Sequence, residues 1–328
     1  MLKLLDKVKL KNEKTMTVKL FVPPEPEFAG KFKHFMRYLS NENTRSVGSR
    51  ADGKYAACAV DCYFIGEIDG RIAGQVWFGW GKHENPAANF GQVYVDVDFR
   101  GLDITKILMK YWLREFSASP VLGAMCTCSY PKIFALYEPS GFHYIYSGSS
   151  RLCCSGSESP YDFKDLTDSY YQPTSLLRLI PGTMEYRHEI DCLLTFTSEL
   201  NSWDRSRVFA ASAVTSFQDA VFKQEDGRGS LYVALADNGH CIGWSFCLSP
   251  LPDVSTIFMD YELHPAYKNF ARQLVKDTCN KWFADHDGKL FASCIKDSEK
   301  MAVLSDAGFT FKTTMETSTS RKTVVMEI

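Results

Sequence analysis

An internal repeat is the feature that most constrains this chain. Landmarks in the first half of the 328 residues return in the second half at an almost constant offset of 167 to 169 residues. The matched positions are Gly74 with Gly243, Arg100 with Lys268, Ala124 with Ala292, and Gly141 and Phe142 with Gly308 and Phe309. A spacing shared by independent landmarks indicates duplicated units. Because one hydrophobic core rarely serves more than ~250 to 300 residues, we expect two domains of similar architecture.

The first half has the element order of an α/β domain. The predicted elements are strand 16–22, helix 25–39, strands 63–68 and 72–80, strand 90–97, helix 104–116, strand 125–129, helix 131–138 and strand 142–146. Asp69 and Gly70 separate the second and third strands and are typical of a tight hairpin turn. The sheet is therefore expected to be mixed but mainly antiparallel, with helices flanking it.

The same order of elements returns in the second half. Residues 151–175 lack apolar periodicity and are rich in Ser, Asp and Tyr, which is typical of an interdomain connection. We therefore predict an N-terminal domain over residues 1–150, a linker over 151–175 and a C-terminal domain over 176–328.

Composition excludes several classes of function. Hydrophobic residues make up 45% of the chain and charged residues 23%, with a formal net charge of -2, as in ordinary soluble globular proteins. That balance gives no sign of a nucleic-acid footprint. Since no apolar run reaches the ~18 residues of a membrane span, and residues 1–14 do not read as a signal peptide, we expect a cytoplasmic protein without membrane partners.

The eleven cysteines are expected to be reduced thiols. Their number is odd, and many lie in apolar segments, as buried thiols of cytosolic proteins do. The pairs Cys126 with Cys128 and Cys153 with Cys154 lack the two-residue spacer and the second ligand pair of a zinc site. We therefore expect no metal.

Two segments of the first half carry a family resemblance. They are GQVYVDVDFRGLDITKILMKYWL at 91–113 and IFALYEPSGF at 133–142. The first resembles the acetyl-CoA signature of the GCN5-related N-acetyltransferase (GNAT) superfamily, in which a strand leads through an Arg/Gln-x-x-Gly-x-Gly/Ala loop into a helix. The second is similar to the family's Ala-x-x-Tyr-x-x-x-Gly-Phe segment. Resemblance covers roughly residues 16–148 and implies tandem GNAT-like α+β domains that use acetyl-CoA as co-substrate.

A strand that turns directly into a helix offers a site for an anion, whatever the family. The first amide N–H groups of the helix have no intrahelical partner, and the helix dipole favours negative charge there. A pyrophosphate fits such amides, and an arginine side chain can add a charge-assisted contact. The predicted cofactor-binding residues are Val95, Asp96, Val97, Arg100, Gly101, Leu102, Asp103, Ile104 and Thr105.

Two positions depart from the family pattern. Asp103 and Thr105 stand where the resemblance implies glycines. An aspartate beside a pyrophosphate adds bulk and like charge, unless it faces outward and caps the helix by accepting its early amides. Thr105 can donate its hydroxyl to a phosphate oxygen. These departures leave open poor CoA affinity or a vestigial pocket.

The resemblance also suggests catalytic residues. Tyr137 matches the position that protonates the departing CoA thiolate in many family members, although a packing role on the sheet is the alternative. Candidates for the base that takes the amine proton are Asp96 at the strand end and Glu84 in the preceding loop, with Asp98 and His83 as further options.

The resemblance implies acetyl transfer from acetyl-CoA to a primary amine of a small molecule or peptide. Two alternatives stay open, namely an acyl or aminoacyl transferase with another donor and a catalytically inactive binding protein. In the second half Lys268 replaces Arg100, Ala271 and Gln273 stand at the two late loop positions, and Leu304 stands at the tyrosine position. Since leucine cannot donate a proton, the C-terminal copy is expected to be degenerate.

Overall fold

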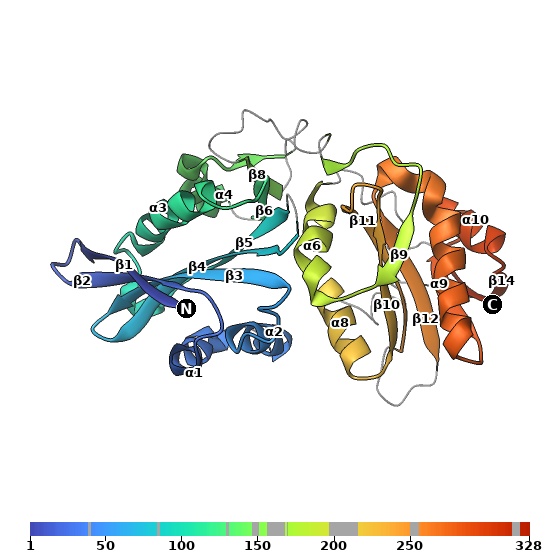
Figure 1. Ribbon diagram of the computed structural model, residues 1–328, viewed down its shortest axis with the longest axis horizontal. Helices are drawn as coiled ribbons and strands as arrows, with labels where there is room; N and C mark the ends of the chain where they lie inside the picture. Colours follow the sequence, from blue (N-terminus) through green and yellow to red (C-terminus); the bar gives the residue numbers. More distant parts are fainter. Residues whose placement is uncertain are drawn as a thin grey trace. The chain divides into compact units, whose positions relative to one another are not determined.

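The chain folds into two compact units, Met1–Thr167 and Asp168–Ile328 (Figure 1). The computed structural model describes residues 1–38, 41–83, 86–128, 131–145, 151–155, 168, 170–196, 216–249, 256–316 and 322–328. Each unit contains one mixed, mainly antiparallel sheet flanked by helices. The predicted α/β (α+β) fold class, with a mixed, mainly antiparallel sheet in each half of the chain, is confirmed.

Unit 1 contains an eight-stranded sheet in the order β1-β2-β3-β4-β5-β6-β8-β7. Its strands are β1 (Leu2–Lys9), β2 (Thr15–Phe21), β3 (Ala59–Ile68), β4 (Arg71–Gly81), β5 (Ala87–Val95), β6 (Gly123–Thr127), β7 (His143–Tyr144) and β8 (Arg151–Ser155). Its helices are α1 (Pro26–Phe35), α2 (Asn41–Ala51), α3 (Ile104–Ser117) and α4 (Pro131–Tyr137), with short 3-10 turns η1 (Met36–Tyr38), η2 (Val97–Phe99) and η3 (Glu138–Ser140). The pairing of β5 with β6 is parallel, whereas the other strand pairs described in this sheet are antiparallel.

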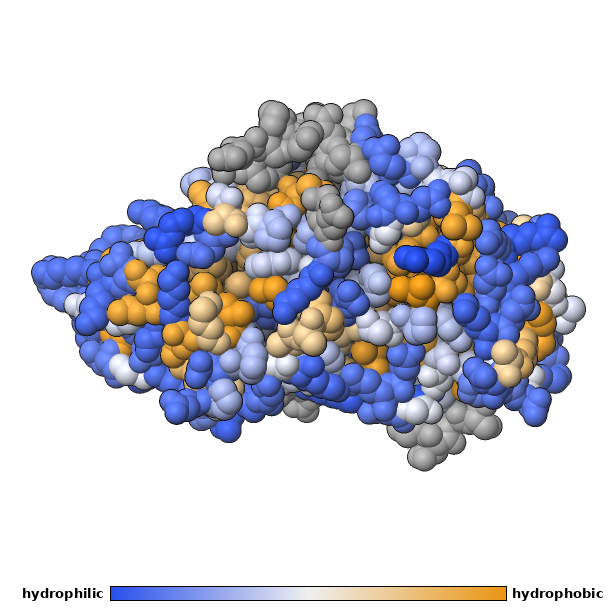
Figure 2. All heavy atoms as spheres, in the orientation of Figure 1, coloured by the Kyte–Doolittle hydropathy of each residue, from blue (hydrophilic) through white to orange (hydrophobic). Residues whose placement is uncertain are grey.

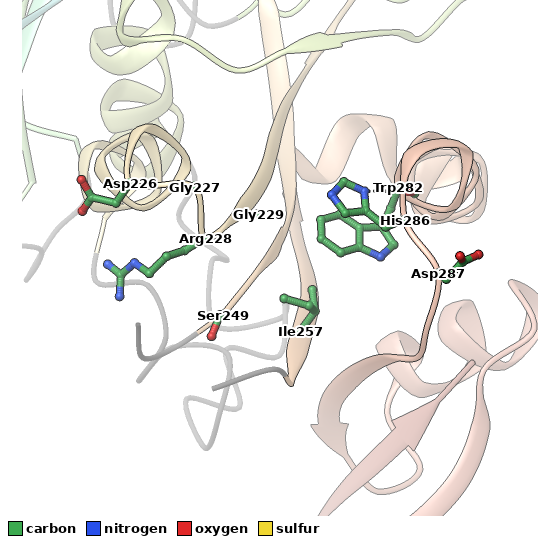
Figure 3. A pocket seen from close by; sticks show the side chains of 9 residues that line it. All are labelled: Asp226, Gly227, Arg228, Gly229, Ser249, Ile257, Trp282, His286 and Asp287. Carbon is green, nitrogen blue, oxygen red and sulfur yellow. Dashed lines mark hydrogen bonds between the residues drawn. The ribbon is translucent and has the colours of Figure 1, made fainter. Parts of the chain in front are cut away.

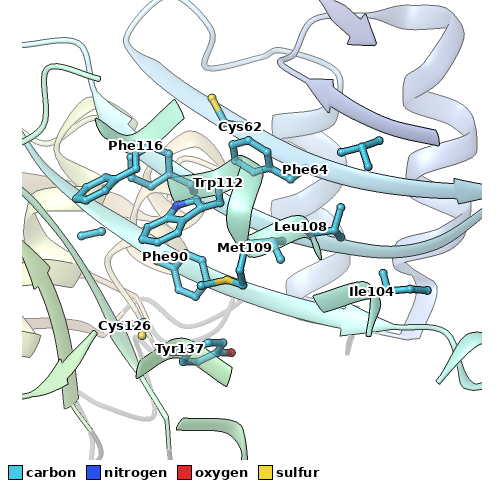
Figure 4. Packing of buried hydrophobic residues seen from close by; sticks show 14 of the residues in the cluster. Cys62, Phe64, Phe90, Ile104, Leu108, Met109, Trp112, Phe116, Cys126 and Tyr137 are labelled. Atoms are coloured by element: carbon cyan, nitrogen blue, oxygen red, sulfur yellow. The ribbon is translucent and has the colours of Figure 1, made fainter. Parts of the chain in front are cut away.

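Helices cover both faces of this sheet (Figure 1). On one face, α3 buries a stripe of Ile104, Leu108, Met109, Trp112 and Phe116, which recurs at helical spacing. Phe90 of β5 meets Trp112 edge to face at 4.8 Å, and Figure 4 shows these rings in one cluster. A separate core on the other face joins α1 and α2 to β2, β3 and β4. The central strands are therefore buried on both faces.

Unit 2 repeats this plan with a seven-stranded sheet in the order β14-β15-β13-β12-β11-β10-β9. Its strands are β9 (Arg178–Pro181), β10 (Gly229–Leu235), β11 (Cys241–Leu248), β12 (Ile257–Leu263), β13 (Leu290–Ile295), β14 (Thr310–Glu316) and β15 (Lys322–Glu327). Its helices are α6 (Arg187–Phe196), α8 (Phe217–Glu225), α9 (Ala271–Asp285) and α10 (Glu299–Asp306), with 3-10 turns η4 (Met184–Tyr186) and η5 (Pro265–Phe270). As in unit 1, one strand pair, β12 with β13, is parallel.

The repeated glycines have a shared physical cause. A Cβ atom on Gly74 would lie 3.1 Å from the carbonyl oxygen of Tyr94, and one on Gly243 would lie 2.6 Å from that of Glu262. Tyr94 and Glu262 are themselves 168 residues apart. In both units the neighbouring strand therefore approaches too closely for a side chain.

Three strands or helices of unit 1 were absent from the sequence prediction. They are the edge strand β1, helix α2 and strand β8. Residues 151–155 were expected in the linker, but they pair with β6 as β8. The predicted strand 142–146 shortens to the two residues of β7 within the described range, and the predicted helix 25–39 ends at Phe35 before η1. All eleven cysteines are free thiols, with Cys153 and Cys154 in β8.

The surface seen in Figure 2 is mainly hydrophilic, with apolar patches on each unit. Exposed large apolar side chains include Leu4 of β1 and Val97 of η2, at 55% and 63% exposure. Among the described helices, none has the length and apolar character that crossing a membrane requires.

Alanine substitutions at three glycines test the close approach of the strands. Gly243→Ala is expected to lower the unfolding free energy by about 3 kcal/mol and Gly74→Ala by about 1 kcal/mol, because the added methyl overlaps a backbone carbonyl more severely at Gly243. Gly30 of α1 is the control, since its Cβ position is open. Gly30→Ala should raise stability by about 0.5 to 1 kcal/mol. Urea unfolding that gave Gly243→Ala and Gly30→Ala equal midpoints would contradict this explanation.

Candidate active site

The parallel strand pair of unit 1 opens toward its carboxyl end. β5 and β6 pair over only three positions, from Ala87 with Gly123 to Asn89 with Met125. β5 nevertheless continues to Val95. Peptide groups in its last part that point away from β4 therefore face no strand, and we call this opening the β5–β6 notch. Ligands of α/β sheets commonly bind outside the carboxyl ends of parallel strands.

A β-bulge lies in the same part of β5. Trp77 of β4 pairs with Gly91, but Gln75, two residues earlier, pairs with Tyr94, so β5 holds one extra residue. Within this bulge Gln92 has a positive φ of 49°. A bulge bends its strand and redirects its side chains, and such features often lie beside active sites.

The loop after β5 leads directly into α3 and leaves its first amides free. Gly101 and Asp103 both have positive φ, at 83° and 58°. Over the described part of the chain, no backbone or side-chain acceptor is seen for the amides of residues 104–106. The Nε atom of Arg100 donates to the carbonyl oxygen of Val95 at 3.3 Å, which holds the arginine beside the strand end. This arrangement can hold an anion such as a pyrophosphate.

Asp103 faces away from these amides. Its carboxylate forms an ion pair with Lys11 of the β1–β2 turn and lies 3.8 Å from Lys106. The hydrogen bond from Lys11 lowers the pKa of Asp103, and the charges of Lys11 and Lys106 add to this effect. Of the alternative in which Asp103 faces outward and caps the helix, the structure has the outward direction but no cap bond to α3. Its negative charge is offset by two lysines.

The other loop side chains mainly support the backbone. Ile104 is buried against Gly74 and Gly66, at the positions where added Cβ atoms would lie 3.0 and 3.5 Å from its Cγ2. Leu102 packs on the same core, and Thr105 is half-buried. Backbone amides rather than side chains are therefore what this loop offers to a ligand.

Tyr137 ends α4 and packs against the core. Its side chain is 6% exposed, and its ring meets Phe90 edge to face at 5.3 Å. Burial raises the pKa of Tyr137 well above its usual range, and the neighbouring Cys126 and Cys128 act in the same direction. The phenol therefore stays protonated at neutral pH and is available as a proton donor. Figure 4 shows Tyr137 at the border of the cluster, near Cys126.

Of the two candidate bases, Asp96 and Glu84, the structure describes only Asp96. Asp96 accepts a hydrogen bond from the amide of Asp98 at 3.0 Å and lies 3.9 Å from Arg71, so its carboxylate holds η2 and a neighbouring arginine. Glu84 lies outside the described residues.

Comparison with known proteins was made by sequence and by structure. No known family matches the sequence, and no curated protein matches it. Among solved structures, a microcin C7 self immunity acetyltransferase in complex with acetyl-CoA and AMP is 13% identical and covers 49% of this chain and 99% of its own, with a TM-score of 0.38. A putative acetyltransferase from Acinetobacter baylyi is 10% identical, covers 48% and 94%, and has a TM-score of 0.37. A spermidine N-acetyltransferase from Vibrio cholerae, in complex with CoA and spermine, is 13% identical, covers 47% and 95%, and has a TM-score of 0.34.

Each of these matches spans about half of this chain and nearly all of the other protein. All three of those proteins are named as acetyltransferases. At such low identity the matches leave substrate and donor open.

Unit 2 has the same strand opening but a different loop. β12 and β13 pair only at Ile257 with Leu290 and Phe258 with Phe291. β12 pairs with β11 without a register shift, so it lacks the bulge of β5. No residue described between 257 and 285 has a positive φ, and η5 runs directly into α9. The loop that frees amides in unit 1 is therefore absent from this part of unit 2.

A buried ion pair joins α10 to β12 in unit 2. Asp260 of β12 corresponds to Gln92 of the bulge, 168 residues earlier. The Nζ atom of Lys300 on α10 lies 2.5 Å from the Oδ1 atom of Asp260, and the side chain of Lys300 is 5% exposed. Beyond the last paired residues of β12 and β13, this ion pair joins α10 to β12.

A separate cavity of about 690 Å³ lies at the other end of β12. Figure 3 shows the parallel rings of Trp282 and His286 on one side of it and Arg228 on the other. Because Ile257, the first residue of β12, lines it, this cavity lies away from the carboxyl end of the strand. Among the described side chains, no group of three or more His, Cys, Asp or Glu is arranged to hold a metal ion.

Sequence reasoning missed the polar residues around the bulge. Gln75 is fully buried, and its Nε2 atom donates to the carbonyl oxygen of Gln92. Tyr38 of η1 stacks on Tyr94 with ring centroids 3.6 Å apart. The available signal was Gln75 itself, a glutamine inside the otherwise apolar run of β4.

Removing the lysine of the buried ion pair tests its importance for unit 2. Lys300→Met is expected to lower the unfolding free energy of unit 2 by about 3 kcal/mol, because it leaves the Asp260 carboxylate without its partner. The double variant Lys300→Met with Asp260→Leu should recover most of this loss. Lys312→Met is the control, since the 2.6 Å pair of Lys312 with Glu327 is exposed and should matter little. Equal thermal shifts for the two single variants would show that the buried pair has no special role.

Proposed function

We propose that unit 1 is an N-acetyltransferase domain that transfers the acetyl group of acetyl-CoA to a primary amine of a small molecule or peptide. Unit 2, in this proposal, is a degenerate copy without its own catalytic site. The observation that carries it is the joint placement of the β5–β6 notch and the free amides of residues 104–106 at the end of one strand. Acetyl-CoA would supply an activated thioester there.

The residues present fit a pyrophosphate group. The amides of residues 104–106 point out of the N-terminus of α3, where the helix dipole favours an anion. Arg100 lies beside them, and a Cβ atom built on Gly101 would meet nothing within 4 Å, so the backbone there is open to a ligand. Asp103 does not oppose this, because it pairs with Lys11.

The remaining steps use the strand and Tyr137. Unpaired peptide groups in the last part of β5 would polarise the thioester carbonyl, and the fixed orientation of the reactants would lower the entropic part of the barrier. Tyr137 would donate its phenolic proton to the leaving thiolate. Its raised pKa keeps that proton in place at neutral pH, and the thiolate is itself a stronger base in a buried environment.

Calorimetric titration with acetyl-CoA tests the site. One site per chain is expected, and Arg100→Ala should weaken affinity by about tenfold through loss of a charge-assisted contact. Lys268→Ala is the matched control at the equivalent position of unit 2 and should change nothing. Two equivalent sites per chain, or weakening by Lys268→Ala alone, would overturn the assignment to unit 1.

Tyr137→Phe separates a proton donor from a packing residue. The change keeps the ring against Phe90 and removes only the hydroxyl, so kcat should fall by about 10² to 10⁴-fold while affinity for acetyl-CoA stays the same. Rapid-quench kinetics would establish that chemistry limits the rate, and thermal unfolding would show that the fold is retained. A change of kcat within about threefold would mean that the thiolate is protonated by water.

A further inference from the structure

The outer edge of β9 in unit 2 lies where unit 1 has an additional strand. β9 pairs with β10 and is the last strand of its sheet, whereas its counterpart β2 pairs with β3 on one side and with β1 on the other. The register defines this match, because Leu179 and Val18 each lie across one strand from the repeated glycines, Gly243 and Gly74. No described strand takes the position of β1 in unit 2.

Peptide groups at this edge of β9 point outward. The amide of Gly182 donates to the carbonyl oxygen of Leu231 on β10 at 2.7 Å. Because successive residues of an antiparallel strand turn their peptide groups to opposite sides, those of Leu179 and Pro181 point away from β10. Pro181 fits this direction, since it has no N–H to give to the ladder. Over the described residues, no acceptor is seen for the N–H of Leu179.

A groove of about 350 Å³ lies between this edge and α9. Its apolar side is formed by Leu176, Leu177 and Leu179, and its polar side on α9 by Asp277, Asn280 and Lys281. Leu176 is 54% exposed, and Figure 2 shows an apolar patch at the place that β9 has in Figure 1. Because β9 is short and ends in a proline, any strand added here pairs over only a few residues.

Unit 1 shows how an added strand contacts the neighbouring helix. Asp6 of β1 lies opposite Val18, and its carboxylate accepts a hydrogen bond from the hydroxyl of Tyr111 on α3 at 2.5 Å. This bond lowers the pKa of Asp6, and the charge of Arg114 acts in the same direction. The strand is therefore held by its ladder to β2 and by polar contacts with α3.

The same helix positions line the groove of unit 2. Three buried residues of each helix match at an offset of 166 residues, namely Leu108, Trp112 and Phe116 with Leu274, Thr278 and Trp282. Tyr111 then corresponds to Asp277, and Arg114 corresponds to Asn280. Where α3 presents a hydroxyl and a guanidinium to β1, α9 presents a carboxylate and an amide to the groove.

We propose that the edge of β9 binds an extended segment of a partner protein as an added antiparallel strand with the pattern Thr-Glu-Val. The threonine lies opposite Leu179 and donates its hydroxyl to Asp277, because α9 offers an acceptor where α3 offers a donor. The glutamate lies opposite Arg178, which is exposed. The valine lies opposite Leu177 and fills the apolar part of the groove. This role does not depend on acetyl transfer.

Calorimetry with the full chain and the acetylated, amidated heptapeptide Ser-Val-Thr-Glu-Val-Ser-Lys tests the charge pairing. Replacing the glutamate of the peptide by lysine should weaken binding by about fivefold, because it places a cation opposite Arg178. In Arg178→Glu the preference should reverse, so that the lysine peptide binds more tightly. Arg272→Glu is the matched control and should keep the original preference, since Arg272 is an exposed arginine of α9 outside the groove.

Loss of one backbone donor tests the strand pairing itself. A peptide with N-methylthreonine lacks the N–H that donates to the carbonyl oxygen of Leu179, and should bind at least about tenfold more weakly. Hydrogen exchange followed by NMR should show the Leu179 amide exchanging at least about tenfold more slowly when the unmodified peptide is bound. The Ile180 amide is the internal control, because it points to β10 with or without peptide.

Each result supports or overturns strand addition. Reversed peptide preference in Arg178→Glu, together with slower exchange at Leu179, supports it. No binding of the heptapeptide at about 1 mM, or equal binding of the N-methylated peptide, overturns it. Slow exchange of the Leu179 amide without peptide would overturn it too, because the edge would already be covered. Dimers that exclude the peptide in sedimentation experiments would assign the edge to a second copy of the chain and not to a partner.

Discussion

Beyond Asn89, β5 has a strand on one side only, and the candidate site depends on this loss of pairing. A strand inside a sheet normally satisfies its peptide groups on both sides, so an early end to the pairing leaves polar backbone available for a ligand. The opening is kept by packing on its two sides. Ile104 fixes the start of α3 against Gly74, and the bulge at Gln92 bends β5 away. The backbone fold, more than any one side chain, builds the site.

The two units share a framework but differ in the residues beside the strand opening. Gly74 and Gly243 preserve the same close strand approach, so the framework is under the same steric constraint in both. The side chains beside the strand opening differ between the two units. In unit 2, Asp260 and Lys300 supply opposite charges that satisfy each other within the protein. Unit 2 thus has a buried ion pair at the position where unit 1 has the amide side chain of Gln92.

Sequence patterns predicted the repeat, the element order and the mixed sheet, because apolar spacing and hairpin signals report on burial directly. These patterns missed elements whose buried residues are polar or whose residues are mostly exposed. Helix α2 was missed because its sequence is polar, yet Arg50 is 2% exposed and pairs with Asp61 of β3. β1 was missed because it is an edge strand exposed along most of its length. β8 was missed because its short apolar run borders a polar segment, and its pairing with β6 is set by tertiary structure.

The sequence predicted where the candidate site lies, but it did not predict what each side chain there contacts. The loop motif located the start of α3, while the direction of Asp103 depends on Lys11, which is distant in sequence and enters through the β1–β2 turn. The contacts of the candidate base could not be predicted from the sequence either. Asp96 is suitable by residue type, but the structure uses it to hold η2 and Arg71. Gln75 reads as a minor irregularity in an apolar strand, and only the bulge opposite it reveals an unpaired oxygen. Residue type alone therefore does not show which of these side chains support the loop and which are available to a ligand.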